Sequence, residues 1–211
     1  MRRYNYTIKL YSSTISIQEE AMEEKLSKRE RTRRTLMHHA KILFEQKGLD
    51  SVTFDDIAQA AKVCRTTVFN HFSTISELMG ALIDGEIQDL TETCCGSGKN
   101  GRELIYLLLD KLSDDLCNYP ILMTRLTNNS ILRGTGSNAI VTLEELIREN
   151  IGFIEPRPCI LNTISEEELP SLIMSVYYGQ VNHIHARGGA FDKNALKDCI
   201  HRMLDYILRG E

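Results

Sequence analysis

Apolar residues recur at helical spacing from Ser27 almost to the end of this 211-residue chain. In the middle of the chain, leucines repeat every fourth residue at positions 104, 108, 112 and 116, which places them on one face of a helix. No segment shows the alternation of apolar and polar residues that is typical of a half-buried strand. The sequence therefore predicts an all-α protein.

Breaks in the helical pattern divide the chain into three parts. Residues 1–24 have no clear period, and we expect an N-terminal arm that is partly disordered. Residues 25–75 hold short helical segments, the first of which ends at Gly48, and residues 76–211 hold longer ones. Expected elements of the third part are a helix running toward Thr91, a linker at Cys95–Gly101, a short helix through Leu132, a helix at 140–151, and two closing helices around 169–184 and 196–207.

The segment from Thr53 to Phe72 predicts two short helices joined by a tight turn. Thr53 and Asp56 have the spacing of a capping box, and Val52 and Ile57 that of a hydrophobic staple. With the helix before Gly48 they make a three-helix helix-turn-helix domain. Its expected core residues are Ile57, Ala58, Val63, Val68 and Phe72. A second capping box is predicted at Thr74 and Glu77. Asp192 is the predicted cap of the last helix, with Phe191 and Leu196 as its hydrophobic staple.

The last of these helices turns polar and aromatic side chains outward, and their types suit a DNA groove. An Arg or Asn side chain can form two hydrogen bonds with the edge of one base, and Thr hydroxyls can bond to phosphates. Charge supports this interpretation, because residues 25–72 hold ten Lys and Arg against five Asp and Glu, while the whole chain has a net charge of −4. The basic run Lys28–Arg34, Arg33 included, is expected to add attraction that is independent of DNA sequence.

Residues 29–80 resemble the DNA-binding domain of the TetR family of bacterial transcriptional regulators, and the residues that carry the resemblance are 40–78, AKILFEQKGLDSVTFDDIAQAAKVCRTTVFNHFSTISEL. The resemblance implies a homodimer with one helix-turn-helix per subunit and a C-terminal helical domain that dimerises and binds a small effector. With the basic residues around them, the positions that match the family's DNA contacts give the predicted DNA-binding set: Arg33, Thr53, Lys62, Arg65, Thr66, Thr67, Phe69, Asn70 and His71.

Four positions depart from the family pattern. Lys62 replaces the usual Gly of the turn, and a left-handed backbone there costs up to about 1 kcal/mol. Cys64 replaces a Ser cap, and a thiol is a poor hydrogen-bond acceptor. Phe69 replaces a Tyr that commonly contacts phosphate, and Ile75 replaces a common Lys. These changes predict weaker or redistributed phosphate contacts with DNA binding retained.

Other function classes find little support in the sequence. No window is apolar enough to span a membrane, and the N-terminus lacks the apolar core of a signal peptide, so we expect a cytoplasmic protein without membrane contact. The six cysteines show no repeated C-x-x-C spacing. His183 and His185, two residues apart on a helix, point to different sides, and Asp114–Asp115 look like a solvated face. We expect no enzyme, no metal site and no cofactor.

The resemblance leads us to expect a repressor that a small apolar or aromatic effector releases from a two-fold symmetric operator. Candidate residues of the effector pocket are Leu108, Met123, Phe153, Met174, Tyr177 and Tyr178. The last two helices are expected to pair with their symmetry mates, with Gly179 allowing close approach. An alternative is a regulator without a small effector, controlled by a protein partner or by oxidation of Cys94 and Cys95.

Overall fold

A computed structural model describes residues 27–126, 138–188 and 192–210. Over these ranges the chain is built of helices, with one isolated bridge between Pro158 and Gly210 and no strand, which confirms the all-α prediction. The predicted arm, the end of the helix expected to reach Leu132, and Phe191 lie outside the described residues. No helix within these ranges is both long and apolar enough to cross a membrane.

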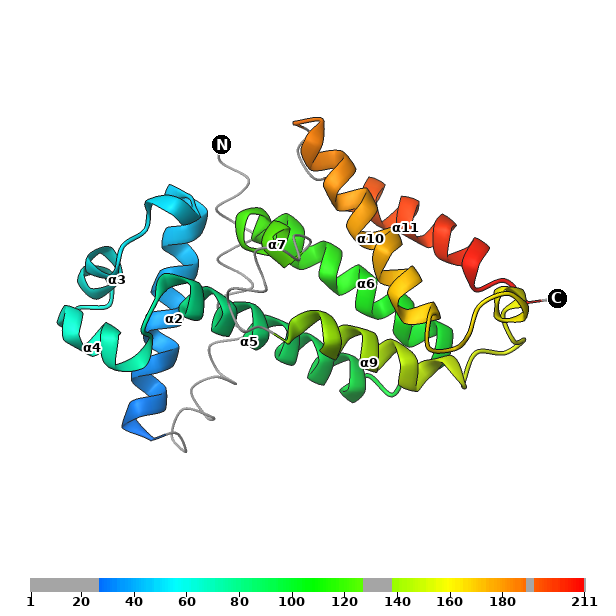
Figure 1. Ribbon diagram of the computed structural model, residues 1–211, viewed down its shortest axis with the longest axis horizontal. Coiled ribbons are helices and arrows are strands. Elements are labelled where there is room, and N and C mark those ends of the chain that lie inside the picture. Colours follow the sequence, from blue (N-terminus) through cyan, green and yellow to red (C-terminus); the bar gives the residue numbers. More distant parts are fainter. Residues whose placement is uncertain (1–26, 127–137, 189–191, 211) are drawn as a thin grey trace.

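Three helices form the N-terminal part of the molecule, at the left of Figure 1. They are α2 (Lys28–Lys47), α3 (Phe54–Ala60) and α4 (Arg65–His71), with a 3₁₀ turn, η1 (Leu49–Ser51), between the first two. Ser27 caps α2 in a capping box with Glu30, and Gly48 ends it at φ 81°. Leu36, Ala40 and Phe44 are fully buried on one face of α2, as the periodicity predicts.

The long helix α5 (Ile75–Gly96) leads from this part into the rest of the chain. Thr74 accepts a hydrogen bond from the Glu77 N–H, but the Glu77 carboxylate turns to the N–H and hydroxyl of Ser73. The predicted capping box is therefore only half formed. The linker prediction is also shifted, because Cys95 and Gly96 continue the helix and the break lies at 97–100.

The C-terminal part packs the remaining helices around a leucine-rich core. These are α6 (Gly101–Asn118), α7 (Pro120–Leu126), α9 (Ala139–Ile151), α10 (Leu169–Ala186) and α11 (Lys193–Ile207), with a 3₁₀ turn, η2 (Cys159–Asn162), before α10. The four leucines of α6 that repeat every fourth residue are all buried. Figure 1 shows α10 and α11 side by side along one outer edge of the molecule.

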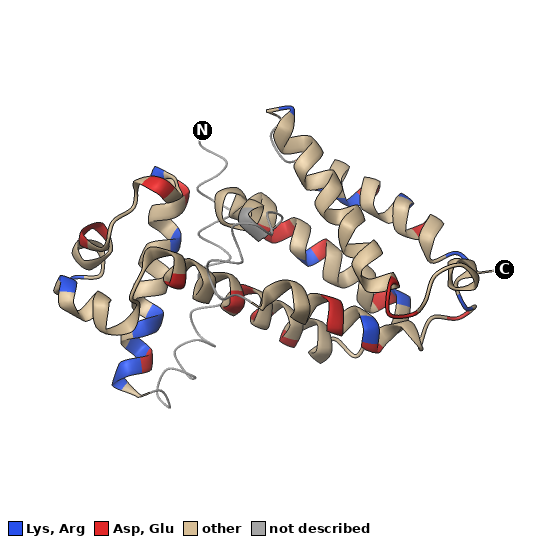
Figure 2. Ribbon diagram, viewed as in Figure 1, with Lys and Arg blue, Asp and Glu red and all other residues tan. Residues whose placement is uncertain are grey.

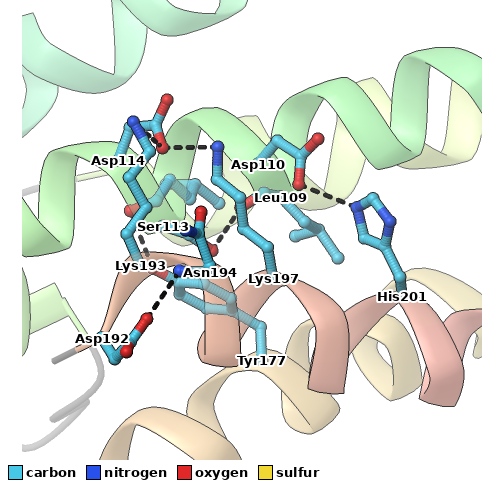
Figure 3. Close-up of polar contacts among 11 residues, drawn as sticks. Leu109, Asp110, Ser113, Asp114, Tyr177, Asp192, Lys193, Asn194, Lys197 and His201 are labelled. Atoms are coloured by element: carbon cyan, nitrogen blue, oxygen red, sulfur yellow. Dashed lines mark hydrogen bonds and ion pairs between the residues drawn. The ribbon is translucent and has the colours of Figure 1, made fainter.

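Polar contacts tie α11 to α6 (Figure 3). Asp114 of α6 lies 2.9 Å from Lys193 Nζ and 2.5 Å from Lys197 Nζ of α11. Asp110 Oδ1 lies 2.8 Å from His201 Nε2. The interpretation of Asp114 as part of a solvated face is therefore wrong, because its carboxylate lies in this helix–helix contact.

Ion pairs and hydrogen bonds also join the N-terminal helices to the C-terminal part. Lys41 Nζ on α2 lies 2.7 Å from Glu86 Oε1 on α5 and 3.5 Å from the centre of the Tyr119 ring. The Glu45 carboxylate on α2 accepts hydrogen bonds from the N–H groups of Ile121 and Leu122, in the first turn of α7. Lys41 and Glu45 are four residues apart, so the two parts meet through polar contacts on one face of α2.

Candidate nucleic-acid interface

The turn between α3 and α4 sets the angle of the outward-facing helix. Val63 N–H donates to the Ala58 carbonyl at 2.9 Å, and Lys62 N–H donates to Gln59 at 3.2 Å. Lys62 has φ 56°, so the left-handed backbone considered from the sequence is present with a non-glycine residue in it. Ile57, Ala58, Val68 and Phe72 are buried and Val63 packs against them, which confirms the predicted small core.

The N-terminus of α3 is fixed by the capping box predicted from the sequence. Thr53 Oγ1 accepts from Asp56 N–H at 3.2 Å, and the Asp56 carboxylate accepts from the Thr53 N–H at 2.9 Å. Lys47 Nζ lies 2.5 Å from the same carboxylate. The hydrogen bond from Lys47, followed by those from Thr53, holds the pKa of Asp56 well below its usual range. The start of α3 is thus held in place and exposed to solvent.

Cys64 stands at the N-cap position of α4 without capping it. Its Sγ lies 3.1 Å from Thr67 Oγ1, and no backbone N–H of the helix bonds to it. The Thr67 hydroxyl, followed by the Thr67 backbone, lowers the pKa of the Cys64 thiol. The sequence prediction that the thiol is a poor backbone cap is confirmed, and the side chain instead restrains Thr67.

The structure brings most of the predicted DNA contacts together on one exposed face. Arg65, Thr66 and Asn70 of α4 are exposed, and Thr67 and His71 are half-buried. Phe69 is 46% exposed and packs edge-on against Phe54, with ring centres 4.7 Å apart. Thr53 and Lys62 are also exposed, at the start of α3 and in the turn. These residues form the reading surface, which we define as Thr53, Lys62, Arg65, Thr66, Thr67, Phe69, Asn70 and His71.

Arg33, the remaining residue of the predicted set, is turned toward the protein. Its Nη1 donates to the His71 carbonyl at 3.1 Å, and its guanidinium lies 4.2 Å from the centre of the Phe72 ring. Arg33 therefore anchors the C-terminal end of α4 to α2. Its role as a DNA contact stays a prediction. No local sequence signal indicates this anchoring, because the two residues are 38 positions apart.

Positive charge gathers beside the reading surface. Lys and Arg residues gather at the N-terminal end of α2, and Arg65 stands at the start of α4, whereas Asp and Glu predominate along α5 (Figure 2). Lys28, Arg31, Thr32, Thr35 and Val63 line a shallow groove of about 420 Å³ between α2 and the turn. Burial, followed by the charges of Arg29 and Arg33, lowers the pKa of His71, which disfavours its charged form.

The candidate effector residues fall in two environments. Leu108, Met123, Met174 and Tyr177 are buried, and the Tyr177 hydroxyl donates to the Leu112 carbonyl at 3.0 Å. The half-buried Tyr178 has a buried hydroxyl that lacks a hydrogen-bond partner in the described residues. Phe153 is 62% exposed in the turn after α9, apart from the four buried candidates, and its place in a pocket wall stays a prediction. A groove of about 310 Å³ between residues 151 and 166 is lined by none of the six candidates.

Residues 36–82 match the family model of the bacterial regulatory proteins of the tetR family. A search of curated proteins finds no match. The fold is similar to that of a TetR-family transcriptional regulator from Agrobacterium tumefaciens, with a TM-score of 0.63 and 16% identity over 85% of this chain and 98% of that one.

Two further solved structures have the same fold. One is NalD of Pseudomonas aeruginosa, the secondary repressor of the MexAB-OprM multidrug efflux pump, with a TM-score of 0.62 and 19% identity over 86% of this chain and 98% of that one. The other is Thermus thermophilus FadR, a TetR-family repressor in complex with lauroyl-CoA, with a TM-score of 0.56 and 19% identity over 85% and 96%. The resemblance predicted from the sequence is confirmed, in the DNA-binding domain by the family model and in the fold by these structures.

Proposed function

We propose that this chain, which carries the DNA-binding domain of the TetR family on the fold of its members, is a ligand-responsive transcriptional repressor. The observation that carries the proposal is the reading surface, where base-bonding and phosphate-bonding side chains share one exposed face of α4 and its turn. In the proposed complex α4 enters the major groove, where Arg65 and Asn70 contact base edges. The free N–H groups at the start of α3 bind a phosphate near Thr53.

The α10–α11 edge supports the proposed homodimer. Ser171, Ser175 and Gly179 are exposed at four-residue spacing on α10, so a second helix can approach this stripe closely. Tyr206 on the neighbouring α11 is 82% exposed and offers an aromatic surface to a partner. Two copies related by a two-fold axis would place their α4 helices in successive major grooves, about 34–36 Å apart.

A bulky side chain at Gly179 tests this interface. A Cβ built on Gly179 meets nothing within 4 Å, so Gly179→Arg leaves the subunit intact and obstructs only a partner helix. Gly152→Arg is the matched control, because that position is equally open and lies after α9, away from the stripe. Light scattering after size exclusion should show a dimer for the wild type and Gly152→Arg, and a monomer for Gly179→Arg. If Gly179→Arg is also a dimer, like the wild type and Gly152→Arg, the result would contradict this interface.

For the effector, we propose a small apolar or aromatic molecule that binds among α6, α7 and α10. The support is the apolar chemistry of Leu108, Met123, Met174 and Tyr177, and the complex of the similar Thermus thermophilus FadR with lauroyl-CoA. Because these side chains are closely packed, binding requires them to rearrange. The effector then shifts the population toward a state whose α4 helices no longer match the operator.

The alternative of control by cysteine oxidation is weaker on chemical grounds. Cys95 is exposed, but burial raises the pKa of the Cys94 thiol to about 11. The reactive thiolate form of Cys94 is therefore scarce near neutral pH. Regulation by a protein partner stays an alternative. The cytoplasmic location and the absence of enzymatic activity, both expected from the sequence, stay predictions.

Selection from a random duplex library tests the proposed function as a whole. The wild-type protein at moderate salt should enrich a site with two-fold symmetry and half-sites one helical turn apart. Addition of straight-chain acyl-CoA or of aromatic compounds should then identify a class that releases the site at saturating concentration. Enrichment of no symmetric site would count against a dimeric operator-binding regulator.

A further inference from the structure

Arg65, the first residue of α4, is held from two sides. Its Nη1 lies 2.9 Å from Asp55 Oδ2 in the first turn of α3, and its guanidinium lies 5.3 Å from the centre of the Phe69 ring. Phe69 is itself fixed against Phe54. The Arg65 and Asp55 side chains are 58% and 65% exposed, so this arrangement lies on the surface where DNA would bind.

A guanidinium held in this way still has hydrogen-bond donors to offer. It carries five N–H groups in a planar fork, and a carboxylate on one edge leaves others free for a second acceptor pair. The O6 and N7 atoms of guanine form such a pair in the major groove. An unrestrained arginine, by contrast, reaches the phosphates of any DNA sequence equally well.

The charge of Asp55 adds a second effect. The Asp55 carboxylate lies beside the Arg65 guanidinium, so it competes with a DNA phosphate for the hydrogen-bond donors of Arg65. This competition acts alike on every DNA sequence. Asp56, the neighbouring acid, has its carboxylate occupied by Thr53 and Lys47 and cannot take this role.

We propose that Asp55 is a positioning residue that determines specificity: it holds Arg65 for the O6 and N7 atoms of a guanine and opposes contacts between Arg65 and phosphate. This inference rests on the proposed function as a DNA-binding regulator. Exposed ion pairs contribute little to stability. Removal of the carboxylate should therefore leave the fold intact and change how the protein selects DNA.

Asp55→Asn removes the charge and keeps the side-chain shape, and Asp55→Ser is a second variant with a residue that helix N-termini tolerate. Asp50→Asn is the matched control, because it makes the same charge change on the same domain outside the Arg65 contact. Arg65→Ala identifies the base pair that Arg65 reads, as the position whose preference it removes. Binding is measured by fluorescence anisotropy on the selected site, on versions with each base at that position, and on random duplex.

Both Asp55 variants should lower discrimination at the Arg65 position by about tenfold, the order of one good base contact. They should also bind random duplex more tightly than Asp50→Asn does. Wild-type discrimination retained in both Asp55 variants, or lost equally at every position, would overturn the inference while leaving the proposed function standing. A wild-type protein that selects no site would overturn both.

Discussion

Lys41 of α2 lies 2.7 Å from the Glu86 carboxylate of α5, and this ion pair joins the DNA-binding helices to the rest of the molecule. The two side chains are only 15% and 24% exposed, and the Lys41 ammonium also lies over the Tyr119 ring. Sequence periodicity predicted the two helices. This contact helps to hold α2 against α5.

Replacement of Lys41 by methionine should destabilise the protein. Glu86 would be left partly buried without its partner, and we expect the free energy of unfolding to fall by about 1–3 kcal/mol. Lys99→Met is the control, since the Lys99–Glu103 pair is exposed and should be worth less than about 1 kcal/mol. Urea denaturation followed by circular dichroism measures both changes. Equal effects of the two substitutions would contradict the role given to Lys41.

Asp115 should make stability depend on pH. Burial, followed by the charge of Glu86, raises the pKa of its carboxyl to about 6 from an ordinary value near 3.8. The contribution of the protonated group is thus complete below about pH 3.8 and is lost as pH rises through 6. The free energy of unfolding should therefore fall by up to about 3 kcal/mol as pH rises, and Asp115→Asn should remove this fall. Urea denaturation at pH 4–8 tests this, and Asp198→Asn on the exposed face of α11 should keep the wild-type slope.

Gly101 begins α6 in a conformation that excludes a side chain. Its φ is +54°, and an added Cβ would lie 2.6 Å from the Phe153 carbonyl oxygen. Gly101→Ala should therefore lower the free energy of unfolding by about 1–3 kcal/mol. Gly96→Ala at the end of α5 meets nothing within 4 Å and should leave stability unchanged or slightly higher. Thermal unfolding of the two variants checks the contrast, and similar melting temperatures would contradict it.

Lys62 should lower the stability of the fold and strengthen its binding to DNA. Lys62→Gly removes a side chain from a left-handed position and should raise the free energy of unfolding by up to about 1 kcal/mol. If its charge contacts phosphate, the same change should reduce the slope of log affinity against log salt by about one. Gly48, the other residue of this domain with positive φ among those described, is a glycine. An unchanged salt slope would remove Lys62 from the DNA contacts.

Local signals in the sequence predicted much of this structure because they act over three or four residues. The Thr53–Asp56 box, the Asp192 cap of α11 and the buried leucines of α6 are all of this kind, and each is present. The helix-turn-helix core followed from the same spacing. Most residues of the reading surface therefore lie on elements that these local signals predict.

Contacts between distant residues were not predictable in this way. The anchoring of Arg33 to the His71 carbonyl and the ion pairs of Asp114 with α11 depend on how helices pack. Phe153 was assigned to a pocket as an aromatic residue, and its exposure follows from the turn that places its carbonyl beside Gly101. Tertiary packing decided these positions, and single-helix periodicity carries no information about it.

Anisotropy titrations of Asn70→Ala and Thr53→Ala, on the selected site and on its single-base variants, distinguish base reading by α4 from binding of the DNA backbone at the start of α3. Asn70→Ala should lose discrimination at one base pair, by about 1–3 kcal/mol, and keep the others. Thr53→Ala should weaken binding to every sequence alike. Uniform weakening by both substitutions would contradict the assignment of α4 as the recognition helix.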